Sequence, residues 1–453
     1  MAIIIDFAQN VGKIKDLNCV NCAPYVVSSG NNQEKIIQTF TELDIPYSRL
    51  HDCCGRYGGT YYVDVPNIFR DFDADVYDEN SYDFHYTDEY IKGIIDSGAS
   101  AYYRLGVTID WGTKKYHTNP PKDYKKWAII CEHIIKHYNE GWNNGFHYGL
   151  TYWEIWNEPE NPAMWSGSKE QFFDLYKVAA VHLKKVFPDI KIGGYGCCGF
   201  YSINEADADD LNRTFIAYLY DFLSMVKKYD VPFDFFSWHT YSDSLSKFTG
   251  YMRFARETLD RYGFSDVEIH CNEWNVGGEG NGYHLMRNMI GASYIASSMC
   301  VMQNTDYVDK AFYYNFSSNS GYNGFFDLNT KMKTCTYYAY KAFGNCHKLK
   351  NQVYVNNDEK KIHVIAASND KQCSILISNY DGKDKKVVVS MENLPIGNRI
   401  FVDSISENCV PKTETYNYCG NSFDLELNAF QHSVISINVV DDSCKDYSVY
   451  NCV

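Results

Sequence analysis

Short apolar runs alternate with longer amphipathic stretches over residues 15–345. The short runs have the length and aromatic or β-branched content of buried strands, whereas the longer ones repeat apolar residues every three or four positions, as helices do. The predicted strands cover 16–22, 47–52, 101–108, 152–158, 191–197, 233–241, 267–274 and 310–316. The clearest predicted helices cover 33–43, 125–138, 171–187, 213–229 and 284–303.

Eight predicted strands, each followed by a helical pattern, are typical of a (β/α)₈ barrel. A doubly wound parallel sheet would show the same alternation, but no Gly-x-Gly-x-x-Gly follows the first predicted strand. We therefore predict an α/β fold in which residues 15–345 form a TIM barrel.

The pattern changes after residue 346, where short strands with alternating polarity are separated by turn residues. "KIHVIAAS", "KKVVVSM" and "HSVISINVV" are examples of these strands. They predict that residues 346–453 form a β-sandwich of about a hundred residues. The opening "AIIIDF" reads as one more strand, so we expect residues 1–14 to join this sandwich. A second domain also fits the length, because 453 residues exceed the size of an ordinary single core.

Composition narrows the possible partners. The net charge of −15 argues against nucleic acid and anionic membranes, since both repel an acidic surface. No run of 18 apolar residues is present, so the sequence predicts no membrane span. The chain has 40 Tyr, 26 Phe and 8 Trp. Aromatic rings stack on sugar faces, which makes carbohydrate a candidate ligand, but the same rings could equally serve as core and rim residues.

The 16 cysteines are expected to be reduced thiols. "MAIIIDFAQN" has neither the basic segment nor the long apolar run of a secretion signal, so we expect a cytoplasmic, bacterial protein without structural disulfides. Cys19 and Cys22 form a lone C-x-x-C without a second ligand pair, which favours buried thiols over a zinc site. The adjacent pairs Cys53-Cys54 and Cys197-Cys198 have no role that the sequence indicates.

Two glutamates end apolar strands in the same local pattern. Glu158 follows Trp-Asn in "WNEPE", and Glu273 follows Cys-Asn in "CNEWN". Each alone could be a buried ion-pair member. At the carboxyl ends of the fourth and seventh strands, however, both would face the mouth of one barrel, where barrel enzymes place their sites. Paired carboxylates there are what glycoside hydrolysis requires, one protonated and one ionised. Trp153, Trp156 and Trp165 could provide apolar surroundings that separate the two pKa values.

These motifs resemble those of clan A glycoside hydrolases, and more closely those of glycoside hydrolase family 39, the family of β-xylosidases and α-L-iduronidases. The resemblance covers both predicted domains. It implies that Glu158 is the acid/base, that Glu273 is the nucleophile, and that Asn157 contacts the sugar 2-hydroxyl. "YSRLHD" and "SWHTY" resemble the segments of the second and sixth strands. They imply a supporting role for Arg49 and substrate-binding roles for His51, His239 and Tyr241, with Tyr241 orienting the nucleophile.

The eighth strand departs from the family pattern. In "YYNFSSNSGYNGFF", Tyr314 stands where the family's β-xylosidases have Trp, and no acidic residue precedes Asp327. Neutral residues (Ser317, Ser318, Asn319 and Ser320) replace the acids that grip outer sugar hydroxyls, so we expect broader sugar tolerance. Residues 311–330 contain no Lys or Arg, which disfavours iduronate, because a uronate carboxylate requires a cationic partner.

The loop 53–86 is longer than an ordinary connection, and long loops at this face usually build the site. Its Tyr57, Tyr61 and Tyr62, together with Trp111, are candidates for stacking on sugar. The alternative for each of them is packing of the loop on itself.

The sequence thus predicts a retaining exo-glycoside hydrolase, β-xylosidase-like, that releases terminal sugars from short plant-polysaccharide oligosaccharides. The predicted partner is an oligosaccharide substrate, with no metal, no organic cofactor, no nucleic acid and no membrane; a homo-oligomer is compatible with the sequence. The alternatives are an α-L-arabinosidase, a β-galactosidase or a β-glucosidase, and, from another class, a carbohydrate-binding barrel without catalysis.

Overall fold

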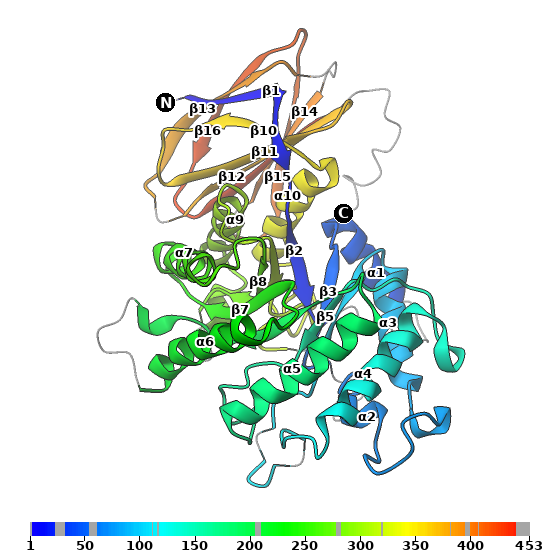
Figure 1. Cartoon of the computed structure of the whole chain (residues 1–453). Helices are drawn as coiled ribbons and strands as arrows, with labels where there is room; N and C mark the ends of the chain where they lie inside the picture. The colour runs from blue at the N-terminus through cyan, green and yellow to red at the C-terminus, as the bar shows by residue number, and fades with distance from the viewer. Residues whose placement is uncertain are drawn as a thin grey trace.

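A barrel surrounded by helices lies beside a sheet-rich part in the computed structural model (Figure 1). The structure describes residues 2–22, 32–53, 61–110, 112–115, 117–203, 210–277, 282–318, 320–380, 382–394, 399–405 and 407–440, with only the backbone described at 32–37. Within these ranges, no helix combines the length and the apolar character needed to cross a bilayer.

Eight parallel strands close into a barrel in chain order, which confirms the predicted fold class. They are β2 (Asp16–Asn21), β3 (Tyr47–Leu50), β4 (Ser100–Leu105), β5 (Tyr152–Ile155), β6 (Lys191–Cys197), β7 (Phe235–Tyr241), β8 (Glu268–Asn275) and β9 (Lys310–Tyr313). The larger helices of this part are α1 (Asn32–Leu43), α3 (His85–Asp96), α4 (Tyr124–Asn139), α5 (Lys169–Val186), α6 (Asp210–Tyr229), α7 (Leu245–Tyr262), α9 (Met289–Gln303) and α10 (Cys335–Leu349). Two single-turn helices, α2 (Val65–Ile68) and α8 (Gly282–Leu285), lie in the connections.

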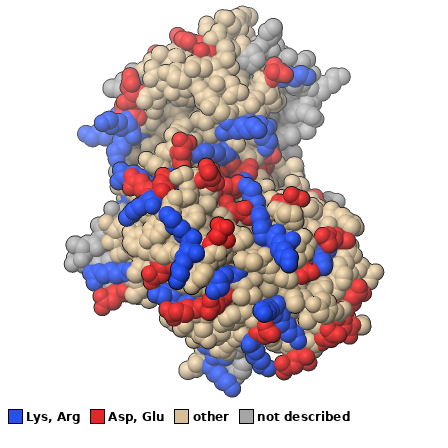
Figure 2. Space-filling model, in the orientation of Figure 1, with Lys and Arg blue, Asp and Glu red and all other residues tan. Residues whose placement is uncertain are grey.

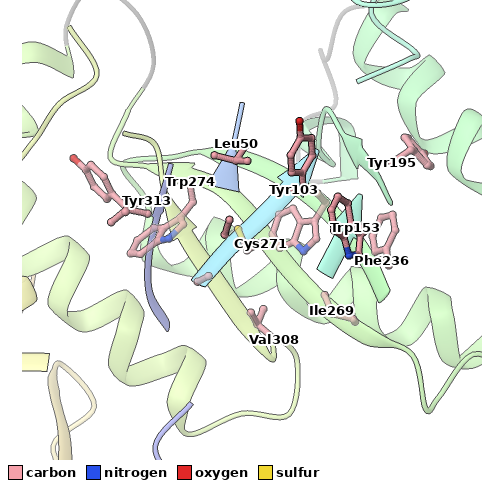
Figure 3. Packing of buried hydrophobic residues seen from close by; sticks show 14 of the residues in the cluster. Leu50, Tyr103, Trp153, Tyr195, Phe236, Ile269, Cys271, Trp274, Val308 and Tyr313 are labelled. Atoms are coloured by element: carbon pink, nitrogen blue, oxygen red, sulfur yellow. The ribbon is translucent and has the colours of Figure 1, made fainter. Parts of the chain in front are cut away.

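Neighbouring aromatic residues of one strand face opposite sides of the barrel wall, as the two-residue period of a strand requires. One residue of each pair lies in a small cluster inside the barrel. The next lies in the large core beneath the helices, part of which is shown in Figure 3. These pairs are Tyr102 and Tyr103, Tyr152 and Trp153, Phe235 and Phe236, and Phe312 and Tyr313. The inner rings fill the amino-terminal half of the barrel, with Tyr102 4.8 Å from Phe312 between ring centroids. The buried His270 lies among these rings, 3.1 Å from the Tyr102 hydroxyl.

The accessory part is a sheet of nine described strands in the order β15-β14-β17-β12-β11-β10-β1-β13-β16. Its strands are β1 (Ala2–Lys13), β10 (Asn351–Asn356), β11 (Ile362–Ser368), β12 (Gln372–Asn379), β13 (Lys385–Glu392), β14 (Arg399–Ile405), β15 (Pro411–Asn417), β16 (Phe423–Ala429) and β17 (Ser433–Val440). The sheet folds over on itself, because Ile400 near one end and Leu425 at the other lie in the same buried cluster. The predicted sandwich is confirmed.

The amino-terminal strand is held in the middle of this sheet. β1 pairs antiparallel with β10 and parallel with β13. In Figure 1 it is the blue strand among the yellow and orange ones. Its Ile3, Ile5 and Phe7 point into the core of the sandwich, so the alternation of "AIIIDF" is explained by one buried and one outward face.

The helices α9 and α10 lie between the barrel and the sheet. Nearly every side chain of α9 is buried, which explains why this helix is apolar all round rather than amphipathic. Ser378 of β12 donates a hydrogen bond to the Ser293 carbonyl, 3.0 Å away, and Asn345 of α10 donates one to Ser436 of β17. Because α10 continues to Leu349, it crosses the domain boundary expected at 345/346, and that division stays a prediction.

Ion pairs are spread over the surface. Acidic and basic side chains are interspersed on the face shown in Figure 2. Exposed pairs such as Lys92 with Asp96 and Lys122 with Asp73 illustrate this local balance. Many acidic side chains on this face therefore have basic side chains as neighbours.

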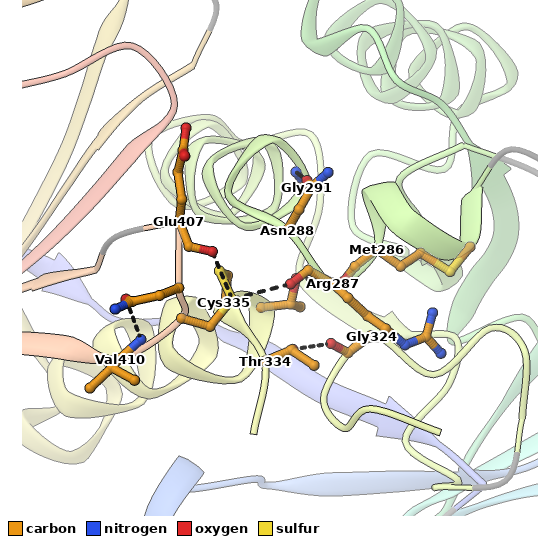
Figure 4. Close-up of a disulfide and its surroundings, with 12 residues drawn as sticks. Met286, Arg287, Asn288, Gly291, Gly324, Thr334, Cys335, Glu407 and Val410 are labelled. Carbon is orange, nitrogen blue, oxygen red and sulfur yellow. Dashed lines mark hydrogen bonds between the residues drawn. A yellow bond between two sulfur atoms is a disulfide. The ribbon is translucent and has the colours of Figure 1, made fainter. Parts of the chain in front are cut away.

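The expectation of fully reduced cysteines is wrong for one pair. Cys335, the first residue of α10, forms a disulfide with Cys409, which lies between β14 and β15 (Figure 4). The bond ties the barrel to the sheet across 74 positions of sequence. No local spacing motif marks such a distant pair. Eleven other described cysteines are free, and Cys19 and Cys22 are buried thiols, as predicted.

We expect the disulfide to stabilise the fold. Cys335→Ser should lower the free energy of unfolding by about 2–4 kcal/mol, because the bond removes loop entropy from the unfolded chain. Cys409→Ser should cause the same loss, and the double variant no further loss, in urea unfolding followed by circular dichroism. Cys419→Ser, at an exposed free thiol, is the matched control. An unfolding midpoint that does not change when dithiothreitol is added to the wild type would contradict this prediction.

Candidate active site

Side chains from six strand ends meet at the carboxyl end of the barrel. The structure brings together Arg49 from β3, Asn157 and Glu158 after β5, His239 and Tyr241 from β7, and Glu273 from β8. Asn21 of β2 and Tyr314 after β9 also lie at this end of the barrel. Convergence at one mouth is what the strand-end positions of these residues predicted.

The chain turns sharply after β5 to place Glu158. Trp156 and Glu158 both have positive φ, 69° and 45°, which is unfavourable for residues with a Cβ and is usually found where function requires it. The Glu158 N–H is held by the carbonyls of Tyr195 and Gly196 on β6. Gly196 has φ +65°, and a Cβ there would lie 3.0 Å from Asn157 Oδ1 and 3.2 Å from His239 Nε2. A glycine is therefore needed beside Glu158.

Arg49 is the hub of the site. Its side chain is fully buried, and it donates from Nε to Glu154 at 2.7 Å, from Nη1 to Glu273 at 2.8 Å and from Nη2 to Asn157 at 2.6 Å. Nη1 also donates to Asn21. Burial alone would lower the pKa of Arg49, but Glu154 and Glu273 outweigh it and raise that pKa. The guanidinium therefore stays charged and fixes both Glu273 and Asn157.

Glu154 was not among the predicted site residues. It is fully buried on the inner face of β5, where its second oxygen accepts hydrogen bonds from Ser237 and Asn272, each at 2.6 Å. A glutamate in the middle of an apolar strand indicates a buried ionic partner, because an unpaired buried carboxylate is costly. That signal was present in "YWEIWNE", but the sequence did not identify Arg49 as its partner.

Glu158 and Glu273 face one another. One carboxyl oxygen of each, together with His239 Nδ1, lies within 4.8 Å of the other two atoms. His239 Nδ1 is 2.6 Å from Glu158 Oε1 and 3.7 Å from Glu273 Oε2. Tyr241 donates its hydroxyl hydrogen to Glu273 Oε2 at 3.0 Å. Glu273 is thus gripped by Arg49 and Tyr241, whereas Glu158 is paired with a histidine.

The proton balance of the pair differs from the sequence expectation. Burial raises the pKa of Glu158, but the hydrogen bond and charge of His239 outweigh it, so that pKa is lowered. Burial would lower the pKa of His239, yet the carboxylates of Glu273 and Glu158 raise it. Trp153, Trp156 and Trp165 lie in the hydrophobic core, each donating its indole N–H to a backbone carbonyl. Without bound substrate, His239 holds the proton and Glu158 is ionised.

A second acidic residue, Glu160, lies behind Glu158. Its Oε1 accepts the backbone N–H of Cys198 at 2.7 Å, and burial, with the nearby Glu158 charge adding to it, raises the pKa of Glu160 to about 7. One member of the vicinal pair Cys197-Cys198 thus has a structural role that the sequence did not indicate.

His51 lies between two carboxylates at the other side of the mouth. Its Nε2 is 3.7 Å from Glu273 Oε1 and 3.4 Å from Asp52 Oδ1. Burial, together with the charge of Arg49, places the pKa of His51 well below its usual range, so the ring is neutral. Tyr314 reaches the same place and donates to Asp52 Oδ2 at 2.7 Å. Asp52 is the second site residue that the sequence analysis missed.

The predicted stacking residues are only partly accounted for. Trp111 and Tyr57, and Asn319 of the eighth-strand segment, lie outside the described residues. Tyr62 stacks on Tyr86, with ring centroids 4.2 Å apart, so its ring packs the loop on itself.

The triad of Glu158, His239 and Glu273 has the donor atoms of a metal site. Its charges are already balanced, however, by the guanidinium 2.8 Å from Glu273 and by the proton on His239. A divalent cation would have to displace both interactions, and we assign no metal to these residues.

The sequence of this chain is similar to those of known proteins. The sequence profile described as "Glycosyl hydrolases family 39" matches residues 1–380. A β-xylosidase of Caldicellulosiruptor saccharolyticus is 28% identical over 258 residues, which are 54% of this chain and 47% of that protein. A β-xylosidase of Geobacillus stearothermophilus is 25% identical over 290 residues, 56% of this chain and 52% of that protein. The chain therefore spans about half the length of these curated relatives.

The fold is also that of solved structures. The structure of a glucosidase from Croceicoccus marinus is 20% identical and superposes with a TM-score of 0.79, covering 97% of this chain and 98% of that chain. At this identity, the likeness concerns the fold.

The pairing of His239 with Glu158 predicts a measurable titration. In Glu158→Gln, the pKa of His239 should fall, because one of the two carboxylates that raise it is lost. The stability contributed by the pair is complete between the ordinary carboxyl pKa of about 4.5 and the ordinary histidine pKa of about 6.5. It is lost as pH rises through the raised pKa of His239 and as pH falls through the lowered pKa of Glu158. NMR titration of labelled imidazoles measures the change. His363, in the accessory sheet, is an internal control with a pKa lowered by burial to about 4. An unchanged His239 titration would contradict the assignment.

Proposed function

Because the chain belongs to glycoside hydrolase family 39, we propose that it is a retaining, β-xylosidase-like exo-glycoside hydrolase that acts on short plant-polysaccharide oligosaccharides. One observation carries this proposal: Glu158 and Glu273 have carboxyl oxygens within 4.8 Å of each other. Retaining glycosidases separate their carboxyl groups by roughly 5–5.5 Å, whereas inverting enzymes leave about 6.5–9.5 Å for a water molecule. The observed approach of the two carboxyl oxygens supports the retaining mechanism.

In the first step, Glu273 attacks the anomeric carbon while Glu158 protonates the departing oxygen. Arg49 and Tyr241 both donate to Glu273, which favours its ionised form and orients the attacking oxygen. The C–O bond to the leaving group breaks as the bond to Glu273 forms. The electron pair of the broken bond takes the proton, so charge and atoms balance.

We assign the proton's source to His239. Its Nδ1–H is 2.6 Å from Glu158 Oε1, so the proton can cross to Glu158 as that carboxylate protonates the leaving group. In the second step, Glu158 accepts a proton from water and passes it back to His239 Nδ1, and the oxygen of that water displaces Glu273 from the sugar. Two displacements return the original anomeric configuration.

The sugar is proposed from the relatives. Two curated relatives are named β-xylosidases, and the facing carboxylates of Glu158 and Glu273 supply the groups that such hydrolysis requires. The arabinosidase, galactosidase and glucosidase alternatives have no observation of their own in this site. A non-catalytic barrel would not need two facing carboxylates held by separate partners. The mechanism requires no metal or organic cofactor.

Compartment and assembly stay predictions. The expected absence of disulfides followed from the predicted cytoplasmic location. The Cys335–Cys409 bond weighs against that location, because such bonds persist mainly in oxidising compartments. The homo-oligomer compatible with the sequence is likewise untested.

A panel of p-nitrophenyl glycosides tests the proposed function. We expect turnover of the β-D-xyloside, with the β-D-galactoside, β-D-glucoside and α-L-arabinoside as comparisons. Glu273→Gln should abolish turnover of every substrate, since the attacking oxygen is lost. The measurement is kcat/KM by nitrophenolate release. Folded wild-type protein that hydrolyses none of these glycosides would contradict the proposal.

A further inference from the structure

The eighth-strand segment does not supply an acid to the site. Asp327, its first acidic residue, is partly exposed and accepts hydrogen bonds from the backbone N–H groups of Asn329 and Thr330, so it stabilises a turn. Ser320 accepts a hydrogen bond from Asn315. The contact expected to grip outer sugar hydroxyls is therefore missing from the described residues of this strand.

An acid enters the same region from a different strand. Asp52 follows β3 with φ +54°, a conformation that is unfavourable for a non-glycine residue. This turn brings its carboxyl group to Tyr314, whose hydroxyl donates to Oδ2 at 2.7 Å. Tyr314 therefore holds in place a carboxylate delivered by β3.

Asp52 is placed to meet a ligand. Its side chain keeps 24% of its surface exposed in a mouth where Glu273 keeps 7%. Its other oxygen, Oδ1, is buried and has no hydrogen-bond partner, although His51 Nε2 is 3.4 Å away. The same ring nitrogen lies 3.7 Å from Glu273. Buried carboxylate oxygens are normally satisfied, so the unpaired oxygen is in keeping with a group that completes its hydrogen bonds when the site is filled.

We propose that Asp52 is the specificity-determining residue that binds a hydroxyl group of the terminal sugar away from the scissile bond. This inference rests on the proposed function and extends it. The Asp52 carboxylate then provides the charged hydrogen-bond acceptor for the sugar that the eighth strand lacks. The site should then discriminate between sugars more strongly than the neutral eighth-strand segment indicates. The reason is that a charge-assisted hydrogen bond is about twice as strong as a neutral one.

The ionisation of Asp52 supports this role. Burial raises its pKa, the Tyr314 hydroxyl lowers it and the Glu273 charge raises it further, to about 7. The charged and titratable groups that face it are Tyr314, Glu273, Arg104, Asp64 and His51. Since only the ionised form is a charge-assisted acceptor, discrimination for the bound hydroxyl should weaken as pH falls below about 7.

The test measures whether the effect of changing Asp52 on kcat/KM depends on the presence of one sugar hydroxyl. It uses the best substrate of the glycoside panel and its 3-deoxy and 4-deoxy analogues. Wild type should lose about tenfold to a hundredfold in kcat/KM on one deoxy analogue. Asp52→Asn should lose a similar factor on the parent substrate and show little further loss on that analogue. Tyr314→Phe should weaken the discrimination partly. Asp71→Asn, the same change at an exposed loop position, should behave as wild type.

Equal losses on the parent and on both analogues would overturn the proposal, because a merely structural role of Asp52 moves all three together. Calorimetric binding of the matching iminosugar and its deoxy analogues gives the same comparison without turnover. If wild type hydrolyses nothing but the binding measurement shows the coupling, the proposed function fails and the role of Asp52 stands. If hydrolysis proceeds without coupling, the role of Asp52 fails alone.

Discussion

A fully buried guanidinium group is the constraint on which the site depends. Arg49 can remain in the barrel interior only because two carboxylates and two amide oxygens receive its hydrogen bonds. Leaving either member of a buried ion pair without its partner costs about 3–5 kcal/mol, so Arg49 and Glu154 require one another. Glu154 in turn is tied to Ser237 of β7 and Asn272 of β8. One network therefore couples five strands, β2, β3, β5, β7 and β8.

This network explains why the two facing carboxylates differ. Glu273 is connected to Arg49, a cation that does not give up its proton, whereas Glu158 is connected to His239, which does. The partners, rather than an apolar surround, set the proton balance in the ligand-free site. One carboxylate is thereby prepared to attack and the other to exchange a proton. Asp52 is a third carboxyl group at the edge of the same charge cluster, restrained by Tyr314.

The fold was largely predictable because short apolar runs alternate with longer amphipathic stretches along residues 15–345. The predicted strand 191–197 is the observed Lys191–Cys197. Others were predicted too long at the carboxyl end: 47–52 against Tyr47–Leu50, and 152–158 against Tyr152–Ile155. The surplus residues include Asp52, Trp156 and Glu158, whose positive φ angles turn the chain out of the strand. Local composition did not reveal where each strand ends, because Trp156 is as apolar and buried as the strand before it.

What the sequence could not show are relations between distant residues. Glu154 and Arg49 are 105 positions apart, and Cys335 and Cys409 are 74 positions apart. The sequence showed that the eighth strand lacks the family's acids, but it did not indicate Asp52 at the end of β3, which we propose as the charged contact instead. Strand-end position identified Glu158 and Glu273 as facing groups, but the partner of each depends on barrel geometry.

Trapping the covalent intermediate tests the central claim most directly, namely that Arg49 prepares Glu273 as the attacking group. A 2-deoxy-2-fluoro glycoside with a good leaving group slows hydrolysis of the glycosyl-enzyme, which mass spectrometry detects as the addition of one sugar. The account predicts that fragmentation of the labelled peptide places this sugar on Glu273. A sugar on Glu158 or Asp52, or turnover to an inverted product without any adduct, would contradict it.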